Sequence, residues 1–295
     1  MTRSIGSSDI AQILGMGALP GAPKWLADKG PWAVYNRLVL GIEDKGDDGA
    51  REVGRVFEGA IRDWCKGQMD FSHVIRGGIE YPDPPIIGPE PWMHDRPDGE
   101  IWLADGDNSF RTGALEVKTC GFFDSDKWGP QGSDQVPPWY EVQCRWHMAV
   151  LDVDVCVLAV AALDQKGRGL RWYQIKRDHV FETDLVNAMR EWFRVHIDGE
   201  QEPTVDSTRS CTHGINARWP EKPGKVWLDA DDDDRILGRD YLDLKEEYEH
   251  LKGALDTVKN NLRARIGDAH GIKGIASNGT NKRGVRSLRV NYKGE

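Results

Sequence analysis

The chain has 295 residues, with 39 basic and 48 acidic side chains and a net charge of −9 at pH 7. Its hydrophobic content of 39% is enough to form a core, which excludes wholesale disorder, and its length predicts one large domain or one domain with an appendage. No apolar run approaches the roughly 20 residues that span a bilayer, and the first residues lack the pattern of a secretory signal, so we expect neither an integral membrane protein nor a secreted one.

Three helical stretches are predicted within the first 65 residues, with Gly-, Pro- and Asp-rich sequence around the second. After Gly6-Ser7-Ser8-Asp9, a helix begins with Ser7 or Ser8 as its N-cap and ends near Gly15, and a short helical stretch is expected at 32–40. A longer helix is predicted from Val53 to about Cys65. Its apolar residues recur with helical period and predict a buried face; they are Val53, Val56, Phe57, Ala60, Ile61 and Trp64.

The middle of the chain is predicted to form strands around one helix. The proline-rich segment 79–97 is expected to be a loop or edge strand. Strands are predicted at Glu100–Ala104 and Gly113–Thr119, joined by the turn signal Asp105-Gly106-Asp107-Asn108. A helix begins at Pro137-Pro138 and continues to about Leu151. A second hairpin (154–163 and 170–176) and a helix (181–197) follow, so this order of elements indicates an α/β core over residues 1–197.

The remainder is predicted to be an appendage. Residues 198–230 contain Pro and Gly at intervals typical of a linker, and 231–266 predict a long polar helix with several leucines available for packing. Residues 259–295 carry nine basic and two acidic side chains, a net charge of +7 on an otherwise acidic chain. This basic segment suits contact with DNA, and the leucine-bearing helix suits contact with protein. A solvated appendage without a partner is the third interpretation, and all three stay open.

The five cysteines are odd in number, widely scattered and without a CxxC pair. This usage favours reduced thiols in the cytoplasm over a disulfide framework, and it argues against most structural zinc sites and iron–sulfur clusters.

Three charged residues carry the strongest chemical signal. Asp98 precedes the first predicted strand, and Glu116 and Lys118 share one face of the second, about 7 Å apart at roughly 3.3 Å per residue. Two carboxylates with water and phosphate oxygens form the ligand set that Mg²⁺ prefers, and a neighbouring lysine offsets charge in phosphodiester hydrolysis. Taken alone, the same residues also fit a surface hairpin with an ordinary ion pair.

Five motifs in order resemble the PD-(D/E)XK nucleases, and within them the phage exonucleases of the YqaJ and lambda-exonuclease type. The resemblance covers about residues 3–197. Its motifs are Gly6-Ser7-Ser8-Asp9-Ile10, Gly54-x-x-x-Glu58, Arg96-Pro97-Asp98-Gly99, Leu115-Glu116-Val117-Lys118-Thr119 and Trp139-Tyr140-Glu141-Val142-Gln143. It implies a central mixed β-sheet flanked by helices, with the C-terminal helical and basic appendage outside the core.

The resemblance also implies roles for individual residues. Asp98 and Glu116 would be metal ligands, with the backbone carbonyl of Val117 as a further one, and Lys118 would be the catalytic lysine. Glu58 would help to organise the metal site, and Gln143 would orient water or phosphate. Ser8, with Arg3 as the nearby basic residue, would hold a terminal 5′-phosphate. Tyr140 would line the DNA site, although a tyrosine at the edge of the core explains it equally well.

The implied function is a deoxyribonuclease, dependent on Mg²⁺ or on Mn²⁺ as a substitute, that digests linear double-stranded DNA from 5′ to 3′. The 3′ single strand would pass to a single-strand annealing protein in phage-type recombination, in a bacterial cytoplasm, and a homotrimeric ring would enclose the DNA. Two alternatives remain: an endonuclease of the same fold, and a non-catalytic DNA-binding scaffold.

Overall fold

The computed structural model describes residues 3–42, 48–68, 73–76, 85–105, 108–120, 127–162, 169–220, 224, 227–280 and 286–292. The chain divides into two compact units, residues 1–221 and 222–295, which are treated separately below. Within the described residues, no helix is both long enough and apolar enough to cross a membrane.

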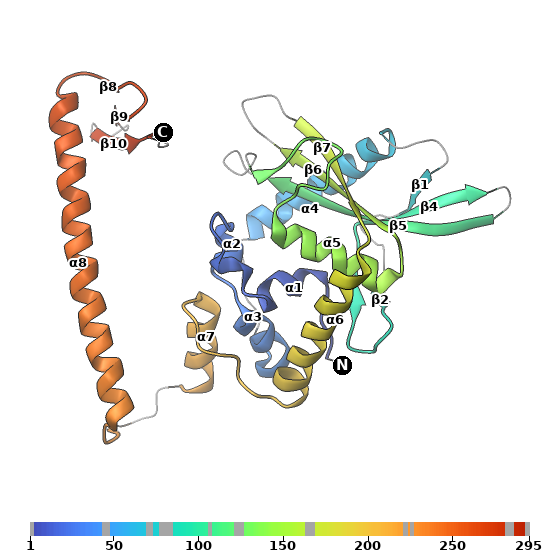
Figure 1. Cartoon of the computed structure of the whole chain (residues 1–295), viewed down its shortest axis with the longest axis horizontal. Helices are drawn as coiled ribbons and strands as arrows, with labels where there is room; N and C mark the ends of the chain where they lie inside the picture. The colour runs from blue at the N-terminus through green and yellow to red at the C-terminus, as the bar shows by residue number, and fades with distance from the viewer. Residues whose placement is uncertain are drawn as a thin grey trace. The chain divides into compact units, whose positions relative to one another are not determined.

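A five-stranded mixed sheet forms the centre of the first unit, with strand order β1-β4-β5-β6-β7 (Figure 1). Neighbouring strands are antiparallel except β5 and β6, which run parallel. The predicted hairpin forms between β4 and β5, with a bulge at Ile101 and Trp102. The strands are β1 (His73–Arg76), β4 (Gly99–Asp105), β5 (Asn108–Cys120), β6 (Val155–Ala162) and β7 (Gly169–Lys176).

Helices cover both faces of this sheet. Helix α5 (Pro138–Leu151) connects β5 to β6, because parallel neighbours need a crossover rather than a tight turn. Helix α4 (Asp48–Lys66) packs on the other face, where Ile61 and Cys65 contact Leu115 and Val117 of β5. The predicted α/β fold with a central mixed sheet flanked by helices is therefore confirmed.

A second helical layer surrounds α5. Trp146 of α5 is fully buried, and its indole N–H donates to the carbonyl of His94 at 3.0 Å. The short strand containing His94 pairs with β2 inside the segment predicted as loop or edge strand. The helices and short strands of this layer are α1 (Ser7–Ile13), α2 (Lys24–Ala27), α3 (Pro31–Tyr35), η2 (Asn36–Leu40), β2 (Ile86–Ile87), β3 (His94–Asp95), α6 (His179–Phe193) and η4 (Arg194–Asp198).

The segment assigned to a linker, 198–230, differs from its prediction in its first two thirds. Helix α7 (Arg209–Arg218) forms there, and Cys211 is buried with Trp32 and Tyr35 of α3. The hydroxyl of Thr208 accepts the backbone N–H of Cys211 at 3.1 Å and caps this helix. Residues 198–221 thus extend the first unit.

Two helix predictions need correction. The N-cap of α1 is Gly6, not Ser7 or Ser8, because the carboxylate of Asp9 accepts the Gly6 N–H at 3.0 Å. In α4 the predicted apolar face is only partly buried: Ile61 packs against the sheet, whereas Val56 and Phe57 are 72% and 44% exposed.

The second unit consists of one long helix and a small sheet. Helix α8 (Asp232–Ile266) is capped by Asp231, whose carboxylate accepts the Asp234 N–H at 2.9 Å. Three antiparallel strands follow it, in the order β10-β9-β8. Only the last turn of α8 is buried, at Ile266. The strands are β8 (Gly271–Ile272), β9 (Ala276–Thr280) and β10 (Arg286–Val290).

Candidate active site

The β4–β5 hairpin brings the three predicted charged residues together. Asp98 stands immediately before β4, and its carboxylate accepts the backbone N–H of Val117 at 2.7 Å. Strand alternation turns Val117 towards α4 and Glu116 and Lys118 towards α5. Lys118 Nζ contacts Glu116 Oε1. The hairpin therefore places two carboxylates and one ammonium in one site.

Glu116 is held by donors from two elements. Besides Lys118, its Oε1 accepts the side-chain amide of Gln143 at 2.6 Å, and its Oε2 lies 3.0 Å from Nε2 of His147. Gln143 and His147 are four residues apart on α5, so they share one face of the helix. With 3% of its surface exposed, Glu116 has exchanged water for these partners.

A buried dyad behind Glu116 is the feature that the sequence did not predict. His147 Nδ1 lies 2.5 Å from the carboxylate of Asp95 in β3, and both side chains are completely buried. Two carboxylates therefore face the two nitrogens of one imidazole, which is the arrangement that a doubly protonated histidine satisfies. The available signal was the spacing Gln143-x-x-x-His147. Asp95, 52 residues away from His147, gave none.

The charges in this site perturb one another strongly. Burial disfavours the ionised Glu116, but Lys118 and His147 outweigh burial and lower the pKa of Glu116 to about 2. Burial likewise opposes the charge of Lys118, yet Glu116 and Asp98 raise its pKa above the usual lysine value. Lys118 therefore stays an ammonium at neutral pH.

Asp98 shows the opposite behaviour to Glu116. Burial, together with the charges of Glu116 and Glu58, raises the pKa of Asp98 to about 8 against the opposing effect of Lys118. Burial also opposes charge on His147, but Asp95 and Glu116 raise its pKa well above the usual histidine value. A carboxyl group that holds its proton near neutral pH marks a place where negative charge is not fully compensated.

The residues present fit a hydrated divalent cation. Mg²⁺ is commonly bound by one or two carboxylates, with water and phosphate oxygens completing its shell. Asp98 and Glu116 supply two carboxylates, and the raised pKa of Asp98 reflects charge that a cation would neutralise. No group of three or more His, Cys, Asp or Glu side chains able to hold a metal occurs in the part of the chain that the structure describes. The protein would therefore supply few ligands and leave the rest to solvent and substrate.

Arg62 links Glu58 to the backbone of Asp98. Arg62 Nη1 lies 3.3 Å from both the carboxylate of Glu58 and the backbone carbonyl of Asp98. The guanidinium is nearly buried and ties α4 to the start of β4. Glu58 thus contributes negative charge near Asp98, with Arg62 between α4 and the hairpin.

The aromatic ring of Tyr140 lies beside Lys118. Lys118 Nζ lies 5.4 Å from the ring centroid of Tyr140, which stacks on Trp128 at 5.5 Å. Trp128 also lines a shallow hollow of about 560 Å³ that includes Glu141. Tyr140 therefore contacts both the charged cluster and Trp128 at the edge of this hollow.

The structure places Ser8 and Arg3, which were predicted to act together, in different surroundings. Ser8 is exposed on α1, whereas Arg3 donates to the Ile197 carbonyl at 2.9 Å and pairs with Glu200 at 2.7 Å. Arg3 thus anchors the N-terminal segment to η4. The basic residue paired with α1 is Arg37, which contacts Asp9 at 2.7 Å.

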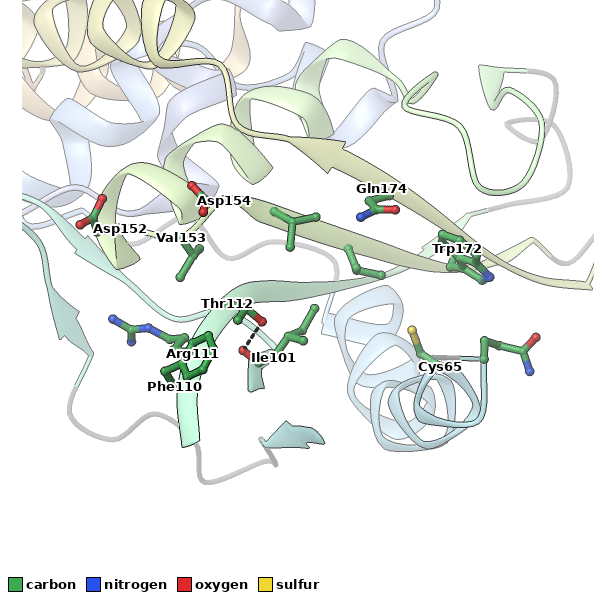
Figure 2. A pocket seen from close by; sticks show the side chains of 13 residues that line it. Cys65, Ile101, Phe110, Arg111, Thr112, Asp152, Val153, Asp154, Trp172 and Gln174 are labelled. Carbon is green, nitrogen blue, oxygen red and sulfur yellow. Dashed lines mark hydrogen bonds between the residues drawn. The ribbon is translucent and has the colours of Figure 1, made fainter. Parts of the chain in front are cut away.

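A cavity of about 480 Å³ lies on the other face of the sheet (Figure 2). Cys65 of α4, Phe110 and Thr112 of β5 and Trp172 of β7 line it, and the Thr112 hydroxyl donates to the Ile101 carbonyl at 3.3 Å. None of the predicted site residues is among those that line this cavity. It is separate from the charged cluster.

Comparison with known proteins gives one sequence match and several structural ones. No family model matches the chain. The chain is 23% identical over 155 residues to YqaJ of Bacillus subtilis, a match that covers 52% of this chain and 47% of YqaJ. The chain therefore spans about half the length of this curated relative.

Two solved structures resemble this chain more distantly. The alkaline exonuclease LHK-Exo of Laribacter hongkongensis, in complex with dAMP, is 15% identical with a TM-score of 0.47, over 67% of this chain and 89% of that one. A phage-related exonuclease from Haemophilus somnus is 12% identical with a TM-score of 0.44, over 68% and 98% of the two chains. The sequence match to YqaJ confirms the resemblance to the YqaJ type that the ordered motifs predicted.

Proposed function

We propose that this chain is a metal-dependent DNA exonuclease. The observation that carries the proposal is the contact of Glu116 with both Lys118 and Gln143, with Asp98 hydrogen-bonded to the intervening Val117. An ordinary surface ion pair does not explain a glutamate that is 3% exposed and receives donors from a strand and a helix. The YqaJ-type resemblance supports the same assignment.

Each side chain has a distinct part in the proposed hydrolysis. A divalent cation, when bound, would polarise the phosphate and a water molecule. Asp98 and Glu116 would hold it, and Gln143 and His147 keep the Glu116 carboxylate in one orientation. The ammonium of Lys118 would offset negative charge that develops on the phosphoryl oxygens. Tyr140 would bound the space in which the phosphate lies.

The finer features of the function rest on the resemblance. We propose digestion of linear duplex DNA from 5′ to 3′, with the remaining 3′ strand passed to an annealing protein and with a trimeric ring enclosing the substrate. Ser8 would contact the 5′-phosphate; the basic side chain that contacts its helix is Arg37, paired with Asp9, rather than Arg3. The second candidate is an endonuclease, which the same cluster would serve equally well.

The test uses linear duplexes labelled at either 5′ end or 3′ end, with a covalently closed circle of the same sequence. With Mg²⁺ we expect loss of the linear substrates and survival of the circle, and EDTA should stop the reaction. Cutting of the circle would favour the endonuclease, and degradation that persists in EDTA would exclude the metal site.

Two variants separate this site from a contaminating nuclease. Glu116→Gln and Lys118→Met should each lower the rate by about two to three orders of magnitude, as when other groups that stabilise a transition state are removed. Lys66→Met is the matched control, because Lys66 lies on the exposed side of α4 and pairs only locally with Asp63 at 3.1 Å. Equal rates in all three variants would reject the assignment.

A further inference from the structure

Helix α8 carries an apolar seam with a regular spacing. Its eight positions alternate between steps of four and three residues, so each pair of steps covers seven residues, a repeat of 3.5. A repeat of 3.5 residues is typical of left-handed coiled coils, whereas a helix packed on a globular core follows 3.6. The seam residues are Leu237, Tyr241, Leu244, Tyr248, Leu251, Leu255, Val258 and Leu262.

The seam is exposed in the second unit. From Leu237 to Val258, every seam side chain is between 55% and 67% exposed, and only Leu262 near the C-terminal end is half-buried. The eight positions span about 37 Å at 1.5 Å per residue. A helix of this length that contains Gly238 and Gly253 gains little from intrinsic propensity, so a partner along the seam would supply most of its stability.

Charges beside the seam identify the partner and its direction. In the heptad notation with Tyr241 at position a, the e positions hold Lys245, Lys252 and Lys259, and two g positions hold Asp240 and Glu247. In a parallel pair of identical helices, each g residue faces the e residue five positions later in the partner. Asp240 then meets Lys245 and Glu247 meets Lys252.

An antiparallel pair would have the opposite electrostatics. There, e faces e and g faces g, so lysines would oppose lysines along one edge. Like charges at these positions disfavour the pairing, and opposite charges support it. We propose that α8 forms a parallel, in-register coiled coil with α8 of a second copy of this chain. This pairing does not depend on the nuclease activity, and it places the two basic C-terminal segments at the same end of the coil.

Cysteine cross-linking of the full-length chain tests the proposal. All five native cysteines are buried, so an added exposed cysteine provides the accessible thiol. Leu244→Cys and Leu255→Cys lie in opposite halves of the seam, and in a parallel pair each faces its own copy at a distance that a disulfide can bridge. We expect each variant alone to form a two-chain disulfide roughly tenfold or more faster than Leu242→Cys, because pairing raises the effective thiol concentration. Leu242 is equally exposed, at 62%, but lies outside the seam.

The outcomes separate the possible partners of the seam. Cross-linking only when Leu244→Cys and Leu255→Cys chains are mixed would mean an antiparallel pair, in which d positions face a positions, and would overturn the proposal. The proposal would also be overturned if the seam variants cross-linked no faster than Leu242→Cys. That result would mean that the seam packs on the first unit or on another protein.

Charge reversal provides an independent check. Lys245→Glu with Lys252→Glu should slow cross-linking, and adding Asp240→Lys with Glu247→Lys in the same chain should restore it. If the reversal has no effect, or if the compensated variant stays slow, the predicted g–e pairs do not form.

Discussion

Replacing His147 with leucine should destabilise the first unit by about 3–5 kcal/mol, the usual cost of removing one partner of a buried ion pair. The structure locates this cost at Asp95 rather than at Glu116. Glu116 keeps Lys118 and Gln143 as donors, whereas Asp95 loses its 2.5 Å contact and is completely buried. The other carboxylate oxygen of Asp95 has no hydrogen-bond partner among the described residues. The variant would thus leave an uncompensated charge in the interior.

Urea unfolding followed by tryptophan fluorescence measures this loss, because every tryptophan except Trp227 lies in the first unit. Adding Asp95→Asn to His147→Leu removes the stranded charge and should recover at least about 1–2 kcal/mol of the loss. His179→Leu, at an exposed histidine, is the control and should stay within about 0.5 kcal/mol of the wild type. A loss below about 1 kcal/mol in His147→Leu, or no recovery in the double variant, would refute the charge-stranding explanation.

Three further predictions concern the site and the cavity behind the sheet. Lys118→Met should lose turnover but still bind duplex DNA in Ca²⁺. An electrophoretic mobility shift measures the binding, and the nuclease assay measures the turnover. Loss of binding would mean that Lys118 acts mainly on the bound substrate in the ground state. Without metal, native Asp98 keeps its proton up to about pH 8 while the unfolded residue loses it near pH 4, so stability should fall as the pH rises between these values. Between pH 5 and 6.5 the free energy of unfolding should fall by about 2 kcal/mol, and Asp98→Asn should remove this pH dependence. If the free energy from urea unfolding falls with pH equally in Asp98→Asn, the raised pKa of Asp98 is contradicted. Burial raises the pKa of the Cys65 thiol to about 11. Its alkylation, measured as the difference between wild type and Cys65→Ser, should therefore be slow at pH 8 and accelerate about tenfold per pH unit. An alkylation rate independent of pH would contradict the raised pKa.

The sequence predicted those parts of the site that local signals specify. Turn residues and strand alternation place Asp98, Glu116 and Lys118 on one hairpin, and the resemblance added Gln143, which the structure brings to Glu116. Asp95 could not be found this way, because its position depends on the pairing of β3 with β2 and on the packing of α5, neither of which has a local pattern.

The errors in the helices have related causes. Periodicity identifies the apolar face of α4 but not whether the chain itself covers it, and Phe57 remains 44% exposed. Ser7 and Ser8 are good N-caps by residue type, but Asp9 already satisfies the free N–H of Gly6. Helix α7 was missed because its ten residues are flanked by prolines and glycines, while its stability comes from burial of Cys211 against α3.

The parallel pairing of β5 with β6 determines when the charged cluster is completed during folding. The hairpin that carries Asp98, Glu116 and Lys118 closes a short loop and needs only neighbouring residues. Gln143 and His147 reach Glu116 only after α5 has crossed the sheet and β6 has docked, with Leu158 beside Glu116 and Val160 beside Lys118. Contacts between residues distant in sequence form slowly because the chain entropy is lost before they are made. A growing polypeptide that already contains both carboxylates and the lysine therefore lacks the contacts of Gln143 and His147 with Glu116 until residues 155–162 have been synthesised and paired.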